Sequence, residues 1–316
     1  MRILITGASG FIGRNLSAYA VAQGHEVVGT YLADGEMSVR GLPRDGVRWV
    51  RLDMQDRAAV ERVVAETDAE GIFHLAAQAY AQKAWKDPAD TFRTNVLGTI
   101  YLYEALRAHP PKRGTLLASS GSAYGAPTRL PIREETPLDA TNPYGVSKAT
   151  QDMLSLQYSL NFGLRIVRAR LFGTTGPGKT GDAMNDFARQ IARLEASGHG
   201  GPVRHGNLTT RRDVSDIRDV LRAMWRIFEA GTPTEAVNVG AGATHTIREI
   251  AETLAGMARV PVELTPDPAL MRPTDEPDNR ADISRLRALG YAPEYPFART
   301  LADALDYWRA APSELG

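Results

Sequence analysis

The sequence contains no cysteine and no long uninterrupted apolar run. Without cysteine there can be no disulfide, thiolate zinc site or cysteine nucleophile, which fits a reducing compartment, so we expect a cytoplasmic protein. No stretch reaches the roughly 18 consecutive apolar residues of a membrane helix. The chain also begins with a strand and a glycine turn, which leaves no room for an export signal. We therefore expect no membrane association.

Net charge is lacking too, because the 37 basic and 37 acidic residues of the 316-residue chain cancel. Without a global positive field, nucleic acid is not an expected partner, and any bound anion must be held by local groups. The six histidines show no metal-ligand spacing, so no metal is predicted. The stretch "ASSGSAYG" lacks the G-x-S-x-G elbow, which argues against a serine hydrolase.

Short apolar runs alternate with segments of helical period through residues 1–171. This alternation predicts βαβ units, and therefore an α/β fold with a doubly wound parallel sheet of the Rossmann type. Parts of 208–245 are assigned to the same region. Glycine-rich pieces follow Leu171 and predict a smaller C-terminal substrate-binding region made of 172–207 and 246–316. The helices expected around the sheet are Phe11 to Gln23, Gln55 to Glu66, Pro88 to His109 and Tyr144 to Phe162.

The first strand runs into "GASGFIG", which contains Gly7, Gly10 and Gly13. Glycines at this spacing let the backbone approach a pyrophosphate, and the free N–H groups of a helix start attract its negative charge. A glycine turn can also serve chain reversal alone. Its place between a first strand and a first helix favours a dinucleotide site.

The second strand ends in "VVGTYLAD", with Thr30 and Tyr31 where an acid would hold the ribose of NAD. Because no acid stands there to repel a ribose phosphate, NADP is mildly favoured over NAD. Arg40 and Arg44 are candidate phosphate ligands, or else solvated loop charges. Asp53 could meet the adenine amino group or cap the next helix.

The segment "NPYGVSKAT" places Tyr144 four residues before Lys148, on one helix face. With "GASGFIG", "LD" at Asp53, "FHLAA", "NVLGT" and "SSGSAYG", this order resembles the extended short-chain dehydrogenase/reductase family over nearly the whole chain. The resemblance implies an enzyme that uses NADP or NAD. A noncatalytic coenzyme sensor is the alternative from another class, and the presence of both Tyr144 and Lys148 argues against it.

The resemblance implies that Ser120, Tyr144 and Lys148 are catalytic. A phenol titrates near pH ~10, so proton transfer at neutral pH needs a nearby cation, and Lys148 has the spacing to supply one. Ser120 would orient a substrate carbonyl, with Ser119 and Ser122 as the alternatives one or two positions away. The coenzyme contacts that we expect, besides Tyr144 and Lys148, are Gly7, Gly10, Phe11, Ile12, Gly13, Asp53, Met54, Leu75, Ala76, Ala77 and Asn95.

Gly121 and Ser122 stand where the sugar-nucleotide dehydratases of this family carry an acidic pair. Neither residue can act as a general acid or base at neutral pH, so dehydration is disfavoured. Hydride transfer remains, either as reduction of a keto sugar or as 4-epimerisation. The C-terminal half, including "GNLTTRRDVSDIRDV" and "DPALMRPTDEP", most resembles the branch that reduces GDP-4-keto-6-deoxy-D-mannose to GDP-6-deoxy-D-mannose.

The same resemblance implies a GDP-sugar partner and a homodimer that pairs the helices near Pro88 to His109 and Tyr144 to Phe162. Arginines suit a diphosphate because their guanidinium groups bind phosphate oxygens in pairs. An arginine beside an aspartate is more often a surface ion pair, and a loop aspartate is often a cap, so these alternatives stay open. The expected substrate ligands are Ser122, Arg170, Arg212, Arg272 and Asp275.

Overall fold

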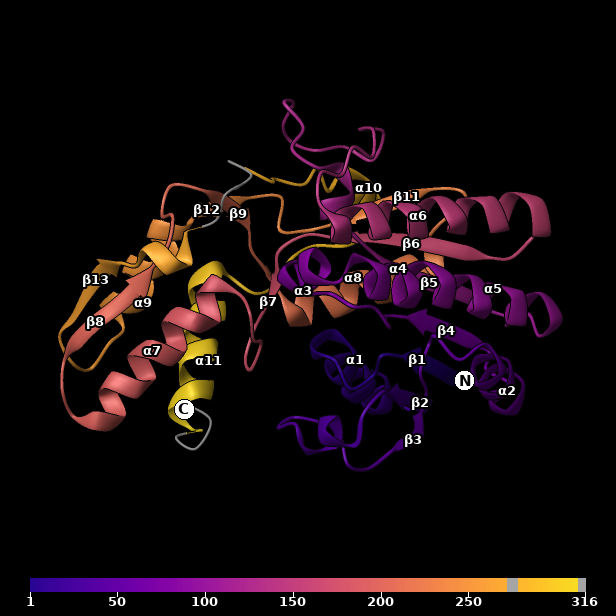
Figure 1. Ribbon diagram of the computed structural model, residues 1–316, viewed down its shortest axis with the longest axis horizontal. Helices are drawn as coiled ribbons and strands as arrows, with labels where there is room; N and C mark the ends of the chain where they lie inside the picture. Colours follow the sequence, from indigo (N-terminus) through magenta and orange to yellow (C-terminus); the bar gives the residue numbers. More distant parts are fainter. Residues whose placement is uncertain (272–277, 312–316) are drawn as a thin grey trace.

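Seven parallel strands form the central sheet in the computed structural model (Figure 1), which describes residues 1–271 and 278–311. The strand order is β11-β6-β5-β4-β1-β2-β3, so successive strands are added outward in both directions from the β1/β4 pair. This arrangement confirms the predicted α/β fold of the Rossmann type. The strands are β1 (Arg2–Thr6), β2 (Glu26–Tyr31), β3 (Val47–Arg51), β4 (Gly71–His74), β5 (Gly114–Ser120), β6 (Ile166–Leu171) and β11 (Ala236–Val239).

Helices cover both faces of this sheet, and each face has its own buried cluster. Side chains alternate between the faces of a strand, so Ile3 of β1 lies in one cluster and Leu4 in the other. The helices of the first face are α1 (Phe11–Ala22) and α8 (Ile217–Ala230), and those of the second are α2 (Arg57–Thr67), α5 (Gly98–Ala108) and α6 (Pro143–Phe162).

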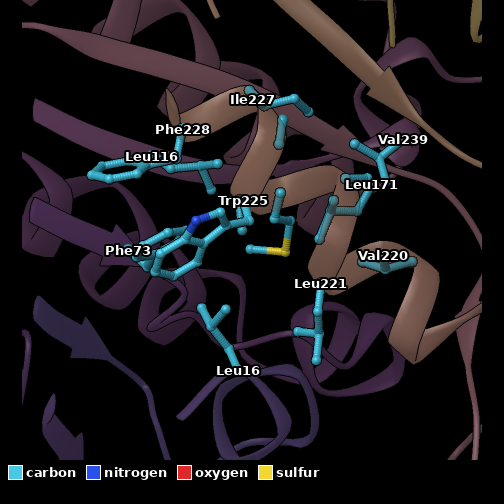
Figure 2. Packing of buried hydrophobic residues seen from close by; sticks show 14 of the residues in the cluster. Leu16, Phe73, Leu116, Leu171, Val220, Leu221, Trp225, Ile227, Phe228 and Val239 are labelled. Atoms are coloured by element: carbon cyan, nitrogen blue, oxygen red, sulfur yellow. The ribbon is translucent and has the colours of Figure 1, made fainter. Parts of the chain in front are cut away.

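The face under α1 and α8 is packed with aromatic rings (Figure 2). Phe73 of β4 stacks on Trp225 with 5.4 Å between ring centroids, and it tilts against Phe228 at 4.7 Å. Phe228 fills the space above Gly71, where a Cβ atom would come within 2.5 Å of the ring. Rings of this size bury the most apolar area per residue, so this cluster is a major source of stability.

The helix expected from Pro88 to His109 is broken in the middle. It consists of α4 (Pro88–Phe92), a π-helical turn η2 (Arg93–Leu97) and α5, and a short α3 (Ala81–Lys86) precedes it. The π turn lies next to α6, and it buries Asn95 completely. Such turns are frequent at functional sites.

The smaller C-terminal region has a third buried cluster, enclosed by α7 (Ala183–Ser197), α9 (Ile247–Gly256) and α11 (Phe297–Arg309). Its parallel strand pair is β8 (Gly201–His205) and β13 (Val262–Pro266), followed by the 3-10 turn η4 (Pro268–Leu270). Figure 1 shows this region beside the edge of the sheet where the parallel strands end. Two smaller strand pairs lie between the regions, β7 (Thr174–Thr175) with β10 (Ser215–Asp216) and β9 (Arg211–Asp213) with β12 (Thr244–Thr246).

One part of the range 246–316 packs on the large region instead of the small one. Residues around α10 (Ser284–Ala288) place Ile283, Leu286 and Tyr291 in the cluster under α8. The polypeptide therefore crosses between the regions repeatedly. The range 246–316, expected to belong to the smaller region, contributes residues to both. Among the described residues, no helix is both long enough and apolar enough to cross a membrane.

Candidate active site

The turn between β1 and α1 is shaped by glycines that leave no room for side chains. Gly7 has a φ of +69°, and a Cβ there would lie 2.7 Å from the Cα of Ala76. At Gly13 a Cβ would lie 2.2 Å from the Gly7 carbonyl oxygen. Helix α1 begins at Phe11, and its N-cap, Gly10, has no side chain to cap the first N–H groups. The first turn of α1 therefore presents open backbone donors and positive helix charge.

This turn lies where the chain reverses its direction of winding. β1 and β4 are neighbours, and the connections after them run to opposite sides of the sheet, which is where α/β sheets bind ligands. Leu75 and Ala76 follow β4, and their N–H groups bond to the carbonyl and hydroxyl oxygens of Thr6, at 3.2 Å each. The predicted backbone-lining residues Leu75, Ala76 and Ala77 thus lie beside the glycine turn. Bare backbone beside an uncapped helix start suits the phosphates of a dinucleotide.

Other predicted coenzyme residues lie around the same edge of the sheet. Ile12 lies in the first turn of α1. Thr30 is buried, and its hydroxyl accepts the Gly7 N–H at 3.0 Å, so it stabilises the turn. Asp53 is exposed and accepts the N–H of Gln55 at 2.9 Å. The alternative that Asp53 caps the next helix is wrong, because α2 begins at Arg57 and is capped by Asp56.

Met54 and Asn95 are both buried and make their contacts within the protein. Met54 is buried against Gly98, where a Cβ would come within 2.8 Å of the Met54 Cβ. The Asn95 Oδ1 accepts the Gln78 N–H at 2.7 Å, and its Nδ2 donates to the Gln78 carbonyl at 3.1 Å and to Ser147 Oγ at 2.9 Å. Asn95 thereby joins the loop after β4 to α6, and its contribution to a coenzyme site is one of position.

Ser120 and Tyr144 meet because β5 and α6 bring them together. Ser120 ends β5 and accepts the N–H of Ser122 at 3.2 Å, which starts the 3-10 turn η3 (Gly121–Tyr124). Tyr144 lies in the first turn of α6, which Asn142 caps. Gly145 lets the two elements touch, since a Cβ there would lie 2.5 Å from the Ser122 carbonyl oxygen. Burial raises the pKa of Tyr144, and its hydrogen bond with Ser120 lowers it in part.

Lys148 lies one turn further along α6, and only 4% of its surface is exposed. Its Nζ donates to the Ala118 carbonyl at 2.7 Å and to Gln151 Oε1 at 2.7 Å. An ammonium group has three donors, so one N–H remains for a ligand. Burial lowers the pKa of Lys148 to about 7, opposed by the charge of Asp152.

A buried chain of hydrogen bonds links Lys148 to the loop that follows β4. Gln151 Nε2 donates to Thr99 Oγ1 at 2.6 Å, and His74 contacts Thr99 through Nε2 at 2.9 Å and Thr6 through Nδ1 at 2.7 Å. The Thr6 hydroxyl in turn accepts the N–H of Ala76. We define these four side chains, Thr6, His74, Thr99 and Gln151, as the polar thread.

The donors and acceptors of the polar thread fix its protons. Thr99 gives its only proton to the Asn95 carbonyl at 2.6 Å, so it can only accept from His74. The His74 proton is therefore on Nε2, and Nδ1 accepts from Thr6. Burial and the charge of Lys148 lower the pKa of His74 to about 3, which agrees with a neutral ring. With Nε2 of Gln151 used by Thr99, its Oε1 must face Lys148 and favours the charged ammonium.

Arg170 is held by protein groups. Its Nε and Nη2 donate to Asp152 at 2.9 and 2.8 Å, and its Nη1 donates to the Tyr124 hydroxyl at 2.7 Å and to the Glu134 carbonyl at 2.9 Å. Burial opposes the ionisation of Asp152, but hydrogen bonds and charge from Arg170 and Arg168 hold the pKa of that carboxyl below its usual range. Because four of the five guanidinium N–H donors are used, we assign Arg170 a structural role in place of the predicted substrate contact.

Of the remaining predicted substrate ligands, the structure describes Ser122 and Arg212. Ser122 lies in η3, directly beside the start of α6. Arg212 lies in β9, half-buried, and its Nη1 donates to the Arg211 carbonyl at 2.8 Å. Arg272 and Asp275 lie outside the described residues.

Two glycines near the site lie where the structure leaves no room for a side chain. A Cβ at Gly121 would lie 2.9 Å from the buried ring of Phe172, so a carboxylic side chain does not fit there without moving that ring. A Cβ at Gly173 would lie 1.8 Å from the Asp213 carbonyl oxygen, since the chain pairs closely there as β7 meets β10. Any side chain at position 173 is therefore excluded by the backbone.

Sequence reasoning missed the polar thread and a carboxylate near the glycine turn, that of Glu36. The thread joins residues that are far apart in the sequence. His74 and Thr99 belong to the "FHLAA" and "NVLGT" stretches, but nothing in those stretches indicates that the two side chains are paired. The only local signal of the thread is Gln151, a polar residue three positions after Lys148 on the buried side of a helix. Glu36 lies in a loop without periodicity, so its contact with the turn could not be foreseen.

Comparisons with known proteins agree with this geometry. The chain matches the family model of GDP-mannose 4,6-dehydratase over residues 4–304. A GDP-6-deoxy-D-mannose reductase of Pseudomonas aeruginosa is 34% identical over 317 residues, which cover 99% of this chain and 99% of the relative.

Solved structures extend the similarity to the fold. The structure of RMD from Pseudomonas aeruginosa complexed with NADPH has a TM-score of 0.83 at 32% identity, covering 98% of this chain and 99% of that one. The UDP-glucose 4-epimerase of Thermus thermophilus, complexed with NAD, has a TM-score of 0.85 at 28% identity, covering 98% of this chain and 100% of that one.

Proposed function

The chain belongs to the GDP-mannose 4,6-dehydratase family, and from this premise we propose that it reduces a GDP-linked 4-keto-6-deoxy sugar. The favoured substrate is GDP-4-keto-6-deoxy-D-mannose, and the product is GDP-6-deoxy-D-mannose. The enzyme is an oxidoreductase that uses NADP or NAD, as the solved relatives hold NADPH and NAD. Full-length similarity to a GDP-6-deoxy-D-mannose reductase supports the sugar and the nucleobase.

One observation carries the choice of reaction within this family. Ser120 and Tyr144 touch and Lys148 lies one helical turn away, yet the two positions after Ser120 hold Gly121 and Ser122. A dehydratase needs an acid and a base there to move protons at neighbouring sugar carbons. The ring of Phe172 also fills the space that a side chain at position 121 would need. The site thus retains the groups for hydride transfer alone.

The proposed mechanism gives each catalytic residue one task. When bound, the coenzyme supplies a hydride to the 4-keto carbon of the sugar. Tyr144 donates its phenolic proton to the carbonyl oxygen, and Ser120 donates a hydrogen bond that orients the same oxygen. The Lys148 ammonium lowers the energy of the resulting phenolate, and its remaining N–H would bind a ribose hydroxyl of the coenzyme. Backbone N–H groups of the Gly7 to Gly13 turn would hold the pyrophosphate.

Substrate binding, assembly and location complete the proposal. Arg212 would reach the nucleotide diphosphate from β9, and Ser122 would contact the sugar beside Tyr144. A homodimer is supported by exposed apolar side chains on η2 and α6, of which Met153 and Leu160 are 64% and 63% exposed. Paired across two copies, such residues would be removed from water. We further propose that the protein works in the cytoplasm, in keeping with its lack of cysteine.

The experiment that tests the reaction follows coenzyme and product together. The purified protein is incubated with GDP-4-keto-6-deoxy-D-mannose and NADPH or NADH, coenzyme oxidation is followed by the loss of the reduced nicotinamide absorbance, and the product is identified by NMR. We expect one coenzyme oxidised per sugar reduced, with GDP-6-deoxy-D-mannose as product. The Tyr144→Phe variant serves as the matched blank.

Two other outcomes would replace the proposal. Interconversion of 4-epimers of a nucleotide sugar without net coenzyme change would establish an epimerase, the reaction of the Thermus relative. Formation of a 4-keto sugar from GDP-mannose without added reductant would establish a dehydratase and would refute the argument from Gly121 and Ser122.

A further inference from the structure

A carboxylate that the second strand does not supply is brought to the glycine turn by the following loop. Glu36 lies in the 3-10 turn η1 (Asp34–Ser38). Its Oε2 accepts the hydroxyl proton of Ser9 at 2.5 Å and the N–H of Leu32 at 3.1 Å. Ser9 is a buried residue of the "GASG" turn, and Leu32 directly follows β2. The carboxylate is therefore fixed between the turn and the end of the strand.

In dinucleotide folds the adenosine ribose binds beside the end of the second strand, and Glu36 is held next to that strand end by Leu32. There an acid some 20 residues after the glycine turn accepts hydrogen bonds from the ribose hydroxyls, and Glu36 follows Gly13 by 23 positions. Thr30, near the end of β2, is not free to accept hydrogen bonds from the ribose in this way, because its hydroxyl already accepts the Gly7 N–H. A carboxylate has about four acceptor positions, so Glu36 can keep Ser9 and Leu32 and still accept from a ribose.

We propose that Glu36 determines the coenzyme specificity of this enzyme by accepting the adenosine ribose hydroxyls of NADH and repelling the 2′-phosphate of NADPH. The proposal rests on the function given above only in that it names the coenzyme of that reaction. It is opposite to the mild preference for NADP that the strand end alone suggests. A phosphate placed against a fixed carboxylate would bring like charges together in a partly buried position.

The cations nearby do not offset this carboxylate equally. Arg40, a candidate phosphate ligand in the sequence, turns away to the C-terminal region, with its guanidinium 4.4 Å from the centre of the Tyr307 ring and its Nη1 donating to the Tyr307 carbonyl at 3.4 Å. Figure 1 shows the loop between β2 and β3, drawn in indigo, on the side of the sheet that faces α11. Arg51 is closer, and its Nε donates to the Leu32 carbonyl at 3.2 Å. Arg51 is thus the residue that would bind a phosphate if the proposal failed.

The test measures coenzyme binding without any sugar, so it is independent of turnover. Isothermal titration calorimetry of coenzyme-free protein gives the Kd values of NADH and NADPH for the wild type and for Glu36→Gln. We expect the wild type to bind NADH at least about tenfold more tightly, since a hydrogen bond to a charged group and a phosphate repulsion act together. In Glu36→Gln the preference should fall by about tenfold, through weaker NADH and stronger NADPH binding.

A matched control and a second variant make the result decisive. Asp34→Asn removes the same charge from the same short turn, where the side chain is exposed, and it should leave the preference unchanged. Equal or tighter binding of NADPH by the wild type would overturn the proposal, as would an unchanged preference in Glu36→Gln. Loss of NADPH binding in Arg51→Gln, from a wild type that prefers NADPH, would assign the specificity to Arg51 instead. A protein that binds NADH selectively but reduces no sugar would refute the proposed reaction and leave this inference intact.

Discussion

The two faces of the central sheet use the same strands for different purposes. The face under α1 and α8 holds stacked rings, Phe73 on Trp225 and Phe228, with apolar neighbours around them. The opposite face, under α5 and α6, is apolar along most of its length but carries the polar thread at the ends of β1 and β4. Phe73 and His74 are adjacent residues of β4 that point to opposite faces.

This difference shows where the fold can bury polar side chains. A buried polar atom is costly unless it is bonded, and the thread meets that condition by pairing each donor with an acceptor from Ala76 to Lys148. The aromatic face has few such groups, among them the Trp225 Nε1, which donates to Glu229 at 3.1 Å, and it contributes stability mainly through buried area and packing. We therefore expect substitutions on the first face to change stability, and those along the second to change catalysis and its pH dependence.

The largest effect is expected from Tyr144→Phe, which tests whether the polar face serves catalysis. Removing the hydroxyl should lower kcat/KM by about 10²- to 10⁴-fold, because the proton donor is lost, while the Kd of the coenzyme stays nearly constant. Steady-state kinetics and calorimetry measure the two quantities. Tyr158→Phe, on the same helix but bonded to Glu104, is the control and should retain turnover. Turnover near that of the wild type in Tyr144→Phe would contradict the assignment.

The aromatic face is tested by Phe228→Ala. The ring is 1% exposed and covers Gly71, so its loss leaves a cavity and should lower the free energy of unfolding by about 3–5 kcal/mol. Urea denaturation gives this value, and kcat per folded molecule should change less than about threefold. Leu270→Ala, at a side chain that is 49% exposed and lies outside the proposed dimer surface, should cost under about 0.5 kcal/mol. A large loss of kcat in folded Phe228→Ala protein would show that the faces are not separate in function.

The smallest effect is expected from Gln151, through the pH profile of kcat/KM. Lys148 acts as a cation, and its pKa of about 7 means that this charge, and with it kcat/KM, is lost as the pH rises through about 7. The Gln151 oxygen favours the ammonium form, so Gln151→Leu should lower the pKa of Lys148 and move the decline to lower pH. Gln151→Glu adds a negative charge and should move it to higher pH.

The size of the shift and its control complete that test. Loss of one hydrogen bond to a charged group corresponds to a shift of about one pH unit. Thr150→Ala, next to Gln151 but with a hydroxyl that bonds back to the Val146 carbonyl, should keep the profile of the wild type. If the Leu and Glu variants of Gln151 share one profile, the thread has only a structural role.

Local signals predicted the fold and the residues that form local motifs. The glycine turn and the spacing of Tyr144 and Lys148 are set within a few residues, so the sequence alone indicates them. Contacts between distant segments carry no such signal. The bond from Glu36 to Ser9 and the pairing of His74 with Thr99 depend on how loops and helices pack, and the π turn at Asn95 interrupts a pattern that still looks helical. The same holds for Arg170, because only the packed structure shows that Asp152, Tyr124 and Glu134 take four of its five donors.

The repeated crossing of the chain between the two regions restricts how new specificities can arise in this enzyme. The range after Leu171 supplies α8 and β11 to the large region, and residues near Ile283 return to its core. Exchanging the C-terminal half with that of a relative would therefore replace part of the sheet and of the core together with the smaller region. Single substitutions in surface loops leave the sheet and the core in place, so they are the less disruptive route to a new specificity.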